Sequence, residues 1–228
     1  MISIVIPTFN ESSTIGPNLE KMLSVISSGD EIIVVDGLSE DGTAEKVKEY
    51  KDVTLVENSV RGRAAQMNRG AREAAGEYIL FLHADTTIDQ TGYKKLINEI
   101  TQNSISWGWF SIKLNSPKFI FRILETLASF RTKIAQEPLG DHGIFVRKDL
   151  FKKVGGYPEI PIMEDVELVK KLKSVSKGKR INHHVLTSIR RFEQGGILST
   201  VLNISFIRIA YYFGKSPEAL SGRYLNHR

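Results

Sequence analysis

Short apolar runs alternate with segments of helical periodicity through the first half of the chain. Each run has the length and the apolar content of a buried strand. The runs lie at residues 2–6, 31–35, 53–56 and 78–82. Residues 15–26, between the first two runs, carry apolar side chains at helical spacing. Residues 64–75, between Gly62 and Gly76, are rich in residues that favour helices, and they predict a second helix. This βαβα order predicts a mostly parallel sheet.

The second half of the chain is less regular. We expect a strand through Trp107–Leu114, an apolar helix at residues 119–134, a short strand at residues 143–146 and a helix that starts near Glu164. At 228 residues the chain fits one α/β domain better than two small independent ones. The prediction is therefore a single domain with a mixed, mostly parallel sheet flanked by helices.

Residues 197–213 are strongly apolar but do not fit a membrane-spanning helix. The segment has only 17 residues and contains Asn203 and Arg208. Two interpretations stay open, because a helix of this kind either packs as core or lies on a membrane surface together with the basic residues at 223–228.

Composition and charge narrow the classes of function. Hydrophobic residues make up 41% of the chain and charged residues 25%, as in a folded globular protein. Cysteine is absent, which excludes disulfides and thiolate metal ligands. The net charge of +5 is spread along the chain, so nucleic acid ranks below an anionic membrane or an anionic small substrate as the partner. The first residues have no leader pattern, from which we expect cytoplasmic residence.

Two of the predicted strands end in carboxylates, at Asp36 and at Asp85. Open α/β sheets bind ligands beyond the carboxyl ends of their strands, so both acids are expected to face one crevice. The alternative role for each is to cap a helix or to form a turn.

Five motifs in chain order resemble the inverting family 2 glycosyltransferases. They are IVIPTFNE at residues 4–11, VVDGLSEDGT at 34–43, RGRA at 61–64, FLHAD at 81–85 and MED at 163–165. The resemblance extends from residue 2 to about residue 195, and it implies a GT-A-like, Rossmann-related fold. A small bacterial subgroup with HAD in place of the DXD element, and with a segment like GDHG at residues 140–143, is the most similar.

The resemblance implies a division of the chain. Residues 1–105 form the nucleotide-binding half, residues 106–195 the acceptor and catalytic half, and residues 196–228 a helical segment. The expected substrates are a nucleotide-sugar donor, with a UDP-sugar favoured, and a hydroxyl acceptor that is a small molecule or a lipid-linked one. A lipid-linked acceptor places the protein at the inner face of the membrane.

The donor-binding residues follow from the same motifs. The loop after the first strand lines the nucleoside and Asp36 accepts from the base, while arginines contact the diphosphate, since guanidinium groups match phosphate oxygens. The nucleotide-sugar set implied by the resemblance is Pro7, Thr8, Asn10, Glu11, Asp36, Arg61, Arg63, Asp85, Asp141, His142 and Arg191.

Asp85 and His83 are the expected metal ligands. A carboxylate suits Mg²⁺ or Mn²⁺, and an imidazole suits Mn²⁺ better. Inversion needs a base that takes the proton of the acceptor hydroxyl. By resemblance this is Asp165, supported by Glu164; the alternative is that both acids merely complement a helix dipole.

Other interpretations fit less well. A sugar nucleotidyltransferase has a glycine-rich loop after its first strand, whereas here the first glycine beyond that strand is Gly16. A dehydrogenase would need the GxGxxG pattern, which is absent. His183 and His184 are adjacent, so as strand residues they are expected to point to opposite faces and not to share an ion. A non-catalytic module that binds carbohydrate or a membrane remains the alternative outside enzymology, because His83 replaces the usual acid.

Overall fold

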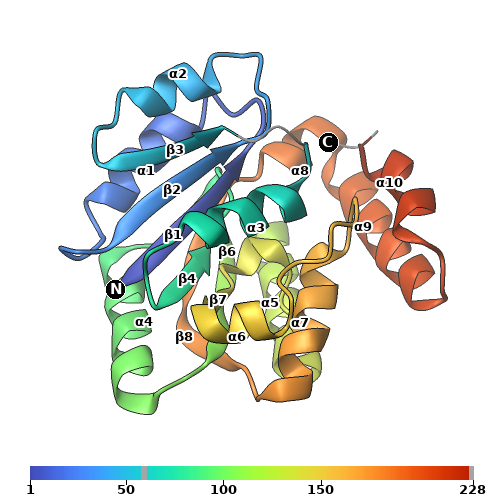
Figure 1. Cartoon of the computed structure of the whole chain (residues 1–228). Helices are drawn as coiled ribbons and strands as arrows, with labels where there is room; N and C mark the ends of the chain where they lie inside the picture. Colours follow the sequence, from blue (N-terminus) through green and yellow to red (C-terminus); the bar gives the residue numbers. More distant parts are fainter. Residues whose placement is uncertain (58–60, 226–228) are drawn as a thin grey trace.

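The computed structural model describes residues 1–57 and 61–225 and shows one sheet with helices on both faces (Figure 1). The strands are β1 (Ile2–Thr8), β2 (Glu31–Asp36), β3 (Val53–Glu57), β4 (Tyr78–Phe81), β5 (Thr86–Thr87), β6 (Trp107–Leu114), β7 (Phe145–Arg147) and β8 (Lys179–Thr187). The helices are α1 (Ile15–Leu23), α2 (Thr43–Lys48), α3 (Arg63–Glu73), α4 (Gln90–Asn103), α5 (Phe119–Ala135), η1 (Gly140–His142), α6 (Lys148–Lys153), α7 (Glu164–Val175), α8 (Arg190–Gly195), α9 (Ile197–Tyr212) and α10 (Pro217–Leu225).

The sheet is mixed, as predicted. Its order is β3-β2-β1-β4-β7-β6-β8-β5. Strands β3, β2, β1 and β4 run parallel, as do β6 and β8. The pairs β4–β7, β6–β7 and β5–β8 are antiparallel. The first four predicted strands and the helix at residues 119–134 are confirmed to within two residues.

The strand expected at residues 143–146 is confirmed to within two residues as Phe145–Arg147, and it starts later because Gly143, with φ +60°, ends η1 in a left-handed conformation. One expectation about the second half is wrong. The rings of His183 and His184 do not point to opposite faces but stack 4.8 Å apart. The register of β8 against β6 shifts from Trp109↔Arg180 to Ser111↔His184, and such a bulge breaks the strict alternation of side chains.

The core forms one layer on each face of the sheet. Alternate residues of the buried strands face opposite layers, so that Ile4 and Ile6 pack with α1 and α4 while Val5 packs with α3. A third, smaller cluster joins α7 to α9 and α10 through residues such as Val166 and Ile207. This cluster attaches the C-terminal helices to the part of the chain that contains Glu164 and Asp165.

Helix α3 holds the ends of β1 and β2 together. The side-chain amide of Gln66 donates to the carbonyls of Thr8 and Val35, at 2.7 Å each. The helix approaches the sheet closely at Gly70, where a β carbon would overlap Val5 Cγ1 and lie 3.0 Å from Val35 Cγ2. Helix α3 therefore holds the two strand ends from which the loops after β1 and β2 begin.

The close approach at Gly70 predicts the effect of added volume. Gly70→Ala is expected to lower the free energy of unfolding by about 1–3 kcal/mol, because the new methyl group would clash with the tightly packed side chains of Val5 and Val35. Urea denaturation measures the difference. The matched control is Gly222→Ala in α10, where a β carbon meets open space, and helix propensity stabilises this variant by up to about 1 kcal/mol. Equal stability of the two variants would contradict the packing described here.

Candidate functional site

The candidate site lies at the carboxyl ends of the parallel strands. Strands β1 and β2 end at Thr8 and Asp36, and β4 is followed by the segment that carries His83 and Asp85. Parallel strands present these ends at one edge of the sheet, which is where α/β folds bind ligands. Asp36 is 4% exposed and Glu11 9% exposed, so both carboxylates are buried in the protein.

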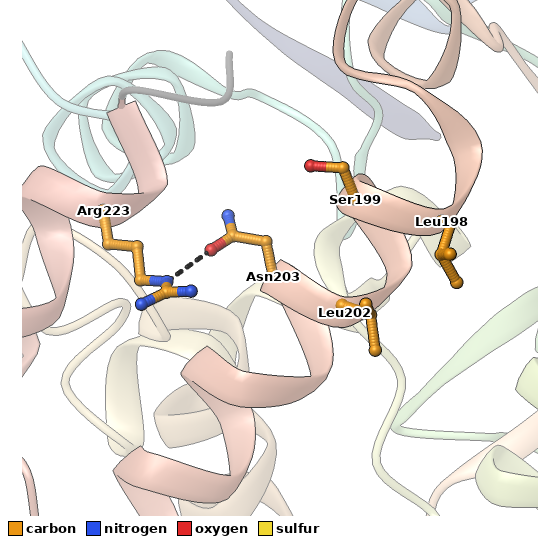
Figure 2. A pocket seen from close by; sticks show the side chains of 5 residues that line it. All are labelled: Leu198, Ser199, Leu202, Asn203 and Arg223. Carbon is orange, nitrogen blue, oxygen red and sulfur yellow. Dashed lines mark hydrogen bonds between the residues drawn. The ribbon is translucent and has the colours of Figure 1, made fainter.

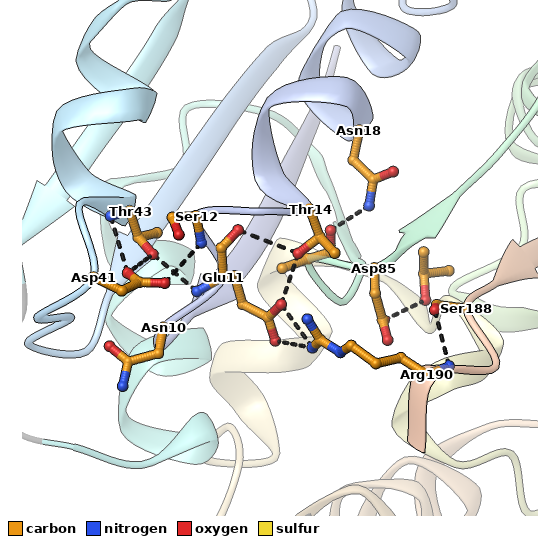
Figure 3. Close-up of polar contacts among 12 residues, drawn as sticks. Asn10, Glu11, Ser12, Thr14, Asn18, Asp41, Thr43, Asp85, Ser188 and Arg190 are labelled. Carbon is orange, nitrogen blue, oxygen red and sulfur yellow. Dashed lines mark hydrogen bonds and ion pairs between the residues drawn. The ribbon is translucent and has the colours of Figure 1, made fainter. Parts of the chain in front are cut away.

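The loop after β1 is fixed to the loop after β2 by a series of hydrogen bonds (Figure 3). Asn10, which has φ +53°, donates its backbone N–H to Ser39 Oγ, and its side-chain oxygen accepts the N–H of Glu40. Asp41 accepts from the N–H of Ser12 and from Thr43. Burial raises the pKa of Asp41, but these hydrogen bonds outweigh it and lower the pKa to about 2.

Asp36 forms a turn at the end of β2. Its carboxylate accepts from Thr8 Oγ1 at 3.1 Å, from the N–H of Ser39 at 2.9 Å and from Ser39 Oγ at 2.6 Å. Pro7 lies inside β1, paired with Val35. Asp36 therefore forms a turn, as the alternative interpretation of its sequence position expected. Recognition of the nucleotide base by the same carboxylate stays a prediction.

Glu11 makes the longest-range ion pair of the site. Arg190 Nη2 donates to both carboxylate oxygens, at 2.8 and 2.7 Å, and joins the loop after β1 to α8 (Figure 3). The N–H of Ser188 donates to the carbonyl of Asp85, so the segment before α8 also contacts the loop after β4. The nucleotide-sugar set expected from the motifs contains Arg191 but not its neighbour Arg190.

Asp85 is a half-buried carboxylate in an acidic environment. Burial, followed by the charge of Glu11, raises the pKa of Asp85, and Asp141 adds to the effect. Arg190 and a hydrogen bond from Thr86 oppose this increase without cancelling it. A cation or an additional donor at this position would relieve the unfavourable charge.

Asp165 is held at the N-terminus of α7 against η1. Its Oδ2 accepts the N–H of Gly140 at 2.7 Å and its Oδ1 accepts the N–H of Val166 at 2.7 Å. A β carbon on Gly140 would lie 2.8 Å from His83 Nε2 and 3.7 Å from Asp165 Oδ2. The imidazole of His83 and the carboxylate of Asp165 therefore meet at the same glycine, although 82 positions separate them in the sequence.

Half-buried Asp141 and buried His142 form a second polar pair. The carboxylate of Asp141 and His142 Nδ1 are 2.8 Å apart, and His142 is 1% exposed. Burial raises the pKa of Asp141, but His142, His83 and Arg131 hold it well below its usual range. Asp141 is therefore ionised and lies close to both His83 and Asp85.

The predicted phosphate-binding arginines occupy different environments. Arg63 forms an ion pair of 2.9 Å with Glu164, so the charge expected at the diphosphate is partly neutralised and Glu164 has a structural role in holding α3 to α7. Arg61 is exposed, pairs with Glu40 and lies 4.7 Å over the ring of Phe9.

Arg191 lies 4.5 Å over the ring of Tyr224, and its Nε and Nη2 atoms are buried with no hydrogen-bond partner among the described residues. Buried guanidinium N–H groups ordinarily find acceptors. Arg191 thus retains unpaired donors, and its role at the diphosphate stays a prediction.

The described residues do not form a complete metal-binding group. No cluster of three or more His, Cys, Asp or Glu side chains arranged to hold an ion occurs in residues 1–57 and 61–225. Asp85 nevertheless supplies one hard oxygen ligand next to two other carboxylates. Any ion here would need ligands from a bound substrate.

The comparisons with known proteins identify the class to which the chain belongs. The family model described as Glycosyl transferase family 2 matches residues 3–154, more than half of the chain. The chain therefore belongs to glycosyl transferase family 2. This confirms the resemblance found in the motifs, whereas the subgroup with HAD stays a prediction.

Curated relatives share parts of the sequence. The poly-β-1,6-N-acetyl-D-glucosamine synthase of Staphylococcus epidermidis is 36% identical over 106 residues, which are 45% of this chain and 26% of that protein. An uncharacterized glycosyltransferase of Haemophilus influenzae is 26% identical over 181 residues, which are 75% of this chain and 62% of that protein. The chain thus spans less than two thirds of the length of these relatives.

Solved structures share the fold. The S. aureus protein TarS, in complex with UDP-GlcNAc, has a TM-score of 0.66 at 18% identity, over 82% of this chain and 58% of that chain. The mannosyltransferase PcManGT from Pyrobaculum calidifontis, in complex with GDP-Man and Mn²⁺, also has a TM-score of 0.66 at 18% identity, over 99% of this chain and 70% of that chain. The chain therefore has the GT-A fold.

The raised pKa of Asp85 predicts a pH-dependent gain in stability for Asp85→Asn. The folded wild type binds this proton more tightly than the unfolded chain, so the carboxyl destabilises the fold increasingly as the pH rises through the folded pKa. Urea denaturation in metal-free buffer is expected to show the variant and the wild type alike in acid and the variant more stable at neutral pH. A difference that is independent of pH would contradict the buried charge.

Proposed function

We propose that this chain transfers a sugar from a nucleotide-sugar donor to a hydroxyl acceptor, with inversion at the anomeric carbon. The observation that carries the proposal is the meeting of Asp165 and His83 at Gly140, beside the ends of the strands that hold Glu11, Asp36 and Asp85. A buried carboxylate thus lies near the edge of the sheet at which α/β folds bind ligands. The fold and the family membership support the same reaction.

In the proposed reaction Asp165 acts as the base. An oxygen of its carboxylate takes the proton of the acceptor hydroxyl while that hydroxyl oxygen bonds to the anomeric carbon. The bond between this carbon and the donor phosphate breaks on the opposite face, and the nucleoside diphosphate leaves. The N–H groups of Gly140 and Val166 hold the carboxylate in one orientation, which reduces the reorganisation needed for the proton transfer.

The donor is proposed to bind along the loops after β1 and β2. Pro7, Thr8, Asn10 and Glu11 are assigned to the nucleoside and Asp36 to the base. Arg61, Arg63 and Arg191 are assigned to the diphosphate, and Asp141 with His142 to the sugar. Structural relatives have been solved with UDP-GlcNAc and with GDP-Man, which supports a nucleotide-sugar donor, and we favour a UDP-sugar.

A divalent cation fits the site only together with the donor. The ligands that we propose are Asp85 and His83, with Mn²⁺ favoured over Mg²⁺ by the imidazole. The raised pKa of Asp85 supports a cation beside that carboxylate, and PcManGT has been solved with Mn²⁺. When bound, the ion neutralises charge that develops on the leaving diphosphate.

The acceptor is proposed to be a hydroxyl compound, either a small molecule or one linked to a lipid. A sugar nucleotidyltransferase and a non-catalytic module that binds carbohydrate or a membrane are the competing functions. Hydrolysis of the donor distinguishes the non-catalytic module from a transferase, because such a module releases no sugar from any donor.

Calorimetric titration of UDP and of GDP, with and without Mn²⁺, tests donor binding. One nucleotide is expected to bind, with an affinity that Mn²⁺ increases, and the increase is expected to disappear in Asp85→Ala. Asp52→Ala is the matched control, because Asp52 is an exposed carboxylate outside the site. Absence of binding of either nucleotide under every condition would overturn the transferase proposal.

Asp165→Asn tests the assignment of the base. The amide keeps the shape of the side chain but takes no proton, so kcat is expected to fall about 10²- to 10⁴-fold while the Kd of the nucleotide changes little. Sugar transfer or donor hydrolysis is measured by release of the nucleoside diphosphate, and NMR of the product reports the anomeric configuration. Unchanged kcat in Asp165→Asn, or a retained configuration, would exclude the mechanism.

A further inference from the structure

Helix α9 exposes five large apolar side chains and buries two polar ones. The exposed side chains are Leu198, Leu202, Phe206, Ile209 and Tyr212, followed by Phe213, which is 86% exposed. The buried side chains include Thr200 and Asn203, at 1% and 3% exposed. A helix on a water-facing surface normally has the opposite arrangement. The outer face of α9 is therefore suited to an apolar environment.

Helix α5 has a second exposed apolar face. Six side chains with spacings of one, three or four residues are exposed along its whole length, with Phe119 at 76% and Ile134 at 67%. The six are Phe119, Ile120, Ile123, Leu127, Phe130 and Ile134. Scattered single apolar residues on a surface need no explanation, but a continuous helical stripe does.

The two stripes contain most of the large hydrophobic side chains that are exposed among the described residues. Fifteen large hydrophobic side chains are exposed among the described residues, and twelve of these belong to α5, to α9 or to Phe213 directly after α9. Large exposed apolar patches mark sites of interaction with a partner or a membrane. This surface, formed by the exposed side chains of α5 and α9, is called the apolar face below.

Helices α5 and α9 are neighbours in the fold. Near the start of α5, the ring of Phe121 contacts Phe192 of α8, at 5.4 Å between centroids, shortly before α9 begins. At the other end, Tyr212 Oη donates to Glu137, two residues beyond α5. Between these ends, burial together with the nearby charge of Arg208 lowers the pKa of Arg131. The aromatic contact to α8 at one end and the hydrogen bond from Tyr212 at the other place the two helices in the same part of the fold.

The charges on the apolar face are positive. The exposed charged side chains of α5 and its N-cap are Lys118 and Lys133, and neither α5 nor α9 exposes a carboxylate. Glu125, the acid within α5, is paired with Arg122. Lys215 and Arg223 lie beyond the end of α9, where each contacts the ring of Phe206.

A groove between α9 and α10 adds to this surface. It has a volume of about 370 Å³ and is lined by Leu198, Ser199, Leu202, Asn203 and Arg223 (Figure 2). Figure 2 shows Arg223 reaching across to Asn203, with a bond of 2.8 Å from Nε to Oδ1, while Leu198 and Leu202 lie on the outer side. The groove thus has an apolar wall and a basic group.

We propose that the apolar face of α5 and α9 lies on the surface of a bilayer that contains anionic lipids. Large apolar side chains would enter the region between headgroups and acyl chains, and the flanking lysines would contact the headgroups. No helix among the described residues is long and apolar enough to cross a membrane, so the helices lie along the surface and do not span it.

A bilayer fits this surface better than a second copy of the chain. In a closed dimer of identical chains the same patch faces itself, so the interface would gather Lys118 and Lys133 of both copies without adding an exposed carboxylate from α5 or α9 to neutralise them. An anionic surface instead neutralises them. The chain as a whole carries a net charge of +5, which favours the same partner.

Binding to vesicles tests the proposal without reference to sugar transfer. The full chain is sedimented with vesicles of phosphatidylcholine, with or without phosphatidylglycerol. The wild type is expected to bind the mixed vesicles. The double variants Leu127→Ser with Phe130→Ser in α5, and Leu202→Ser with Ile209→Ser in α9, are each expected to reduce partitioning at least about tenfold. Lys118→Ser with Lys133→Ser is expected to reduce binding to the mixed vesicles at least about tenfold.

Controls separate loss of binding from loss of folding. All four apolar positions are already exposed, so serine there removes little packing. Val175→Ser, which changes an exposed valine at the end of α7, is the matched variant and is expected to bind like the wild type. Thermal unfolding in solution is expected to be similar for all variants.

Three results would overturn the proposal. These are failure of the folded wild type to bind mixed vesicles, equal binding of wild type and double variants, and a stable dimer in solution that the double variants dissociate. The last would assign the apolar face to self-association, and sedimentation equilibrium detects it. Binding of UDP or GDP by calorimetry stays independent of all three, so failure here leaves the proposed reaction untouched.

Discussion

Parallel pairing of β1 with β2 and β4 is the constraint on which the site depends. It brings three strand ends to one edge of the sheet, and Gln66 holds the first two together by donating to the carbonyls of both. Each following loop is then stabilised by its neighbour, as in the bonds between residues 10–12 and 39–43. The polar groups of the site are thereby ordered before any ligand arrives.

The carboxylates of the site are only partly neutralised by the cationic side chains around them. Glu11 is paired with Arg190, and Asp141 is stabilised by His142, His83 and Arg131, whereas Asp85 has a raised pKa. A buried carboxylate whose charge is only partly balanced costs stability, and such groups concentrate where proteins bind ligands. The same imbalance explains why a cation is favourable beside Asp85.

The apolar face and the site belong to the same part of the fold. Helix α5 leads through Glu137 to η1, whose Gly140 contacts Asp165, and α9 follows α8, whose Arg190 contacts Glu11. The third core cluster joins α9 and α10 to α7. In the proposed arrangement on a bilayer, the acceptor half of the site is therefore connected to the membrane surface by short stretches of chain.

The sequence by itself determined the layout of the nucleotide-binding half. Apolar runs and helical periodicity located β1 to β4, α1 and α3, because these elements are specified by local patterns of burial. The family followed from motifs that lie at strand ends. Tertiary structure alone decided which charges meet: Arg190 with Glu11, Arg63 with Glu164, and Asp165 with Gly140 and His83. It also decided that α9 exposes five large apolar side chains and that β8 carries a bulge between Arg180 and His184. Such contacts join residues far apart in the chain, and only the packing of the whole sheet with its helices brings them within bonding distance.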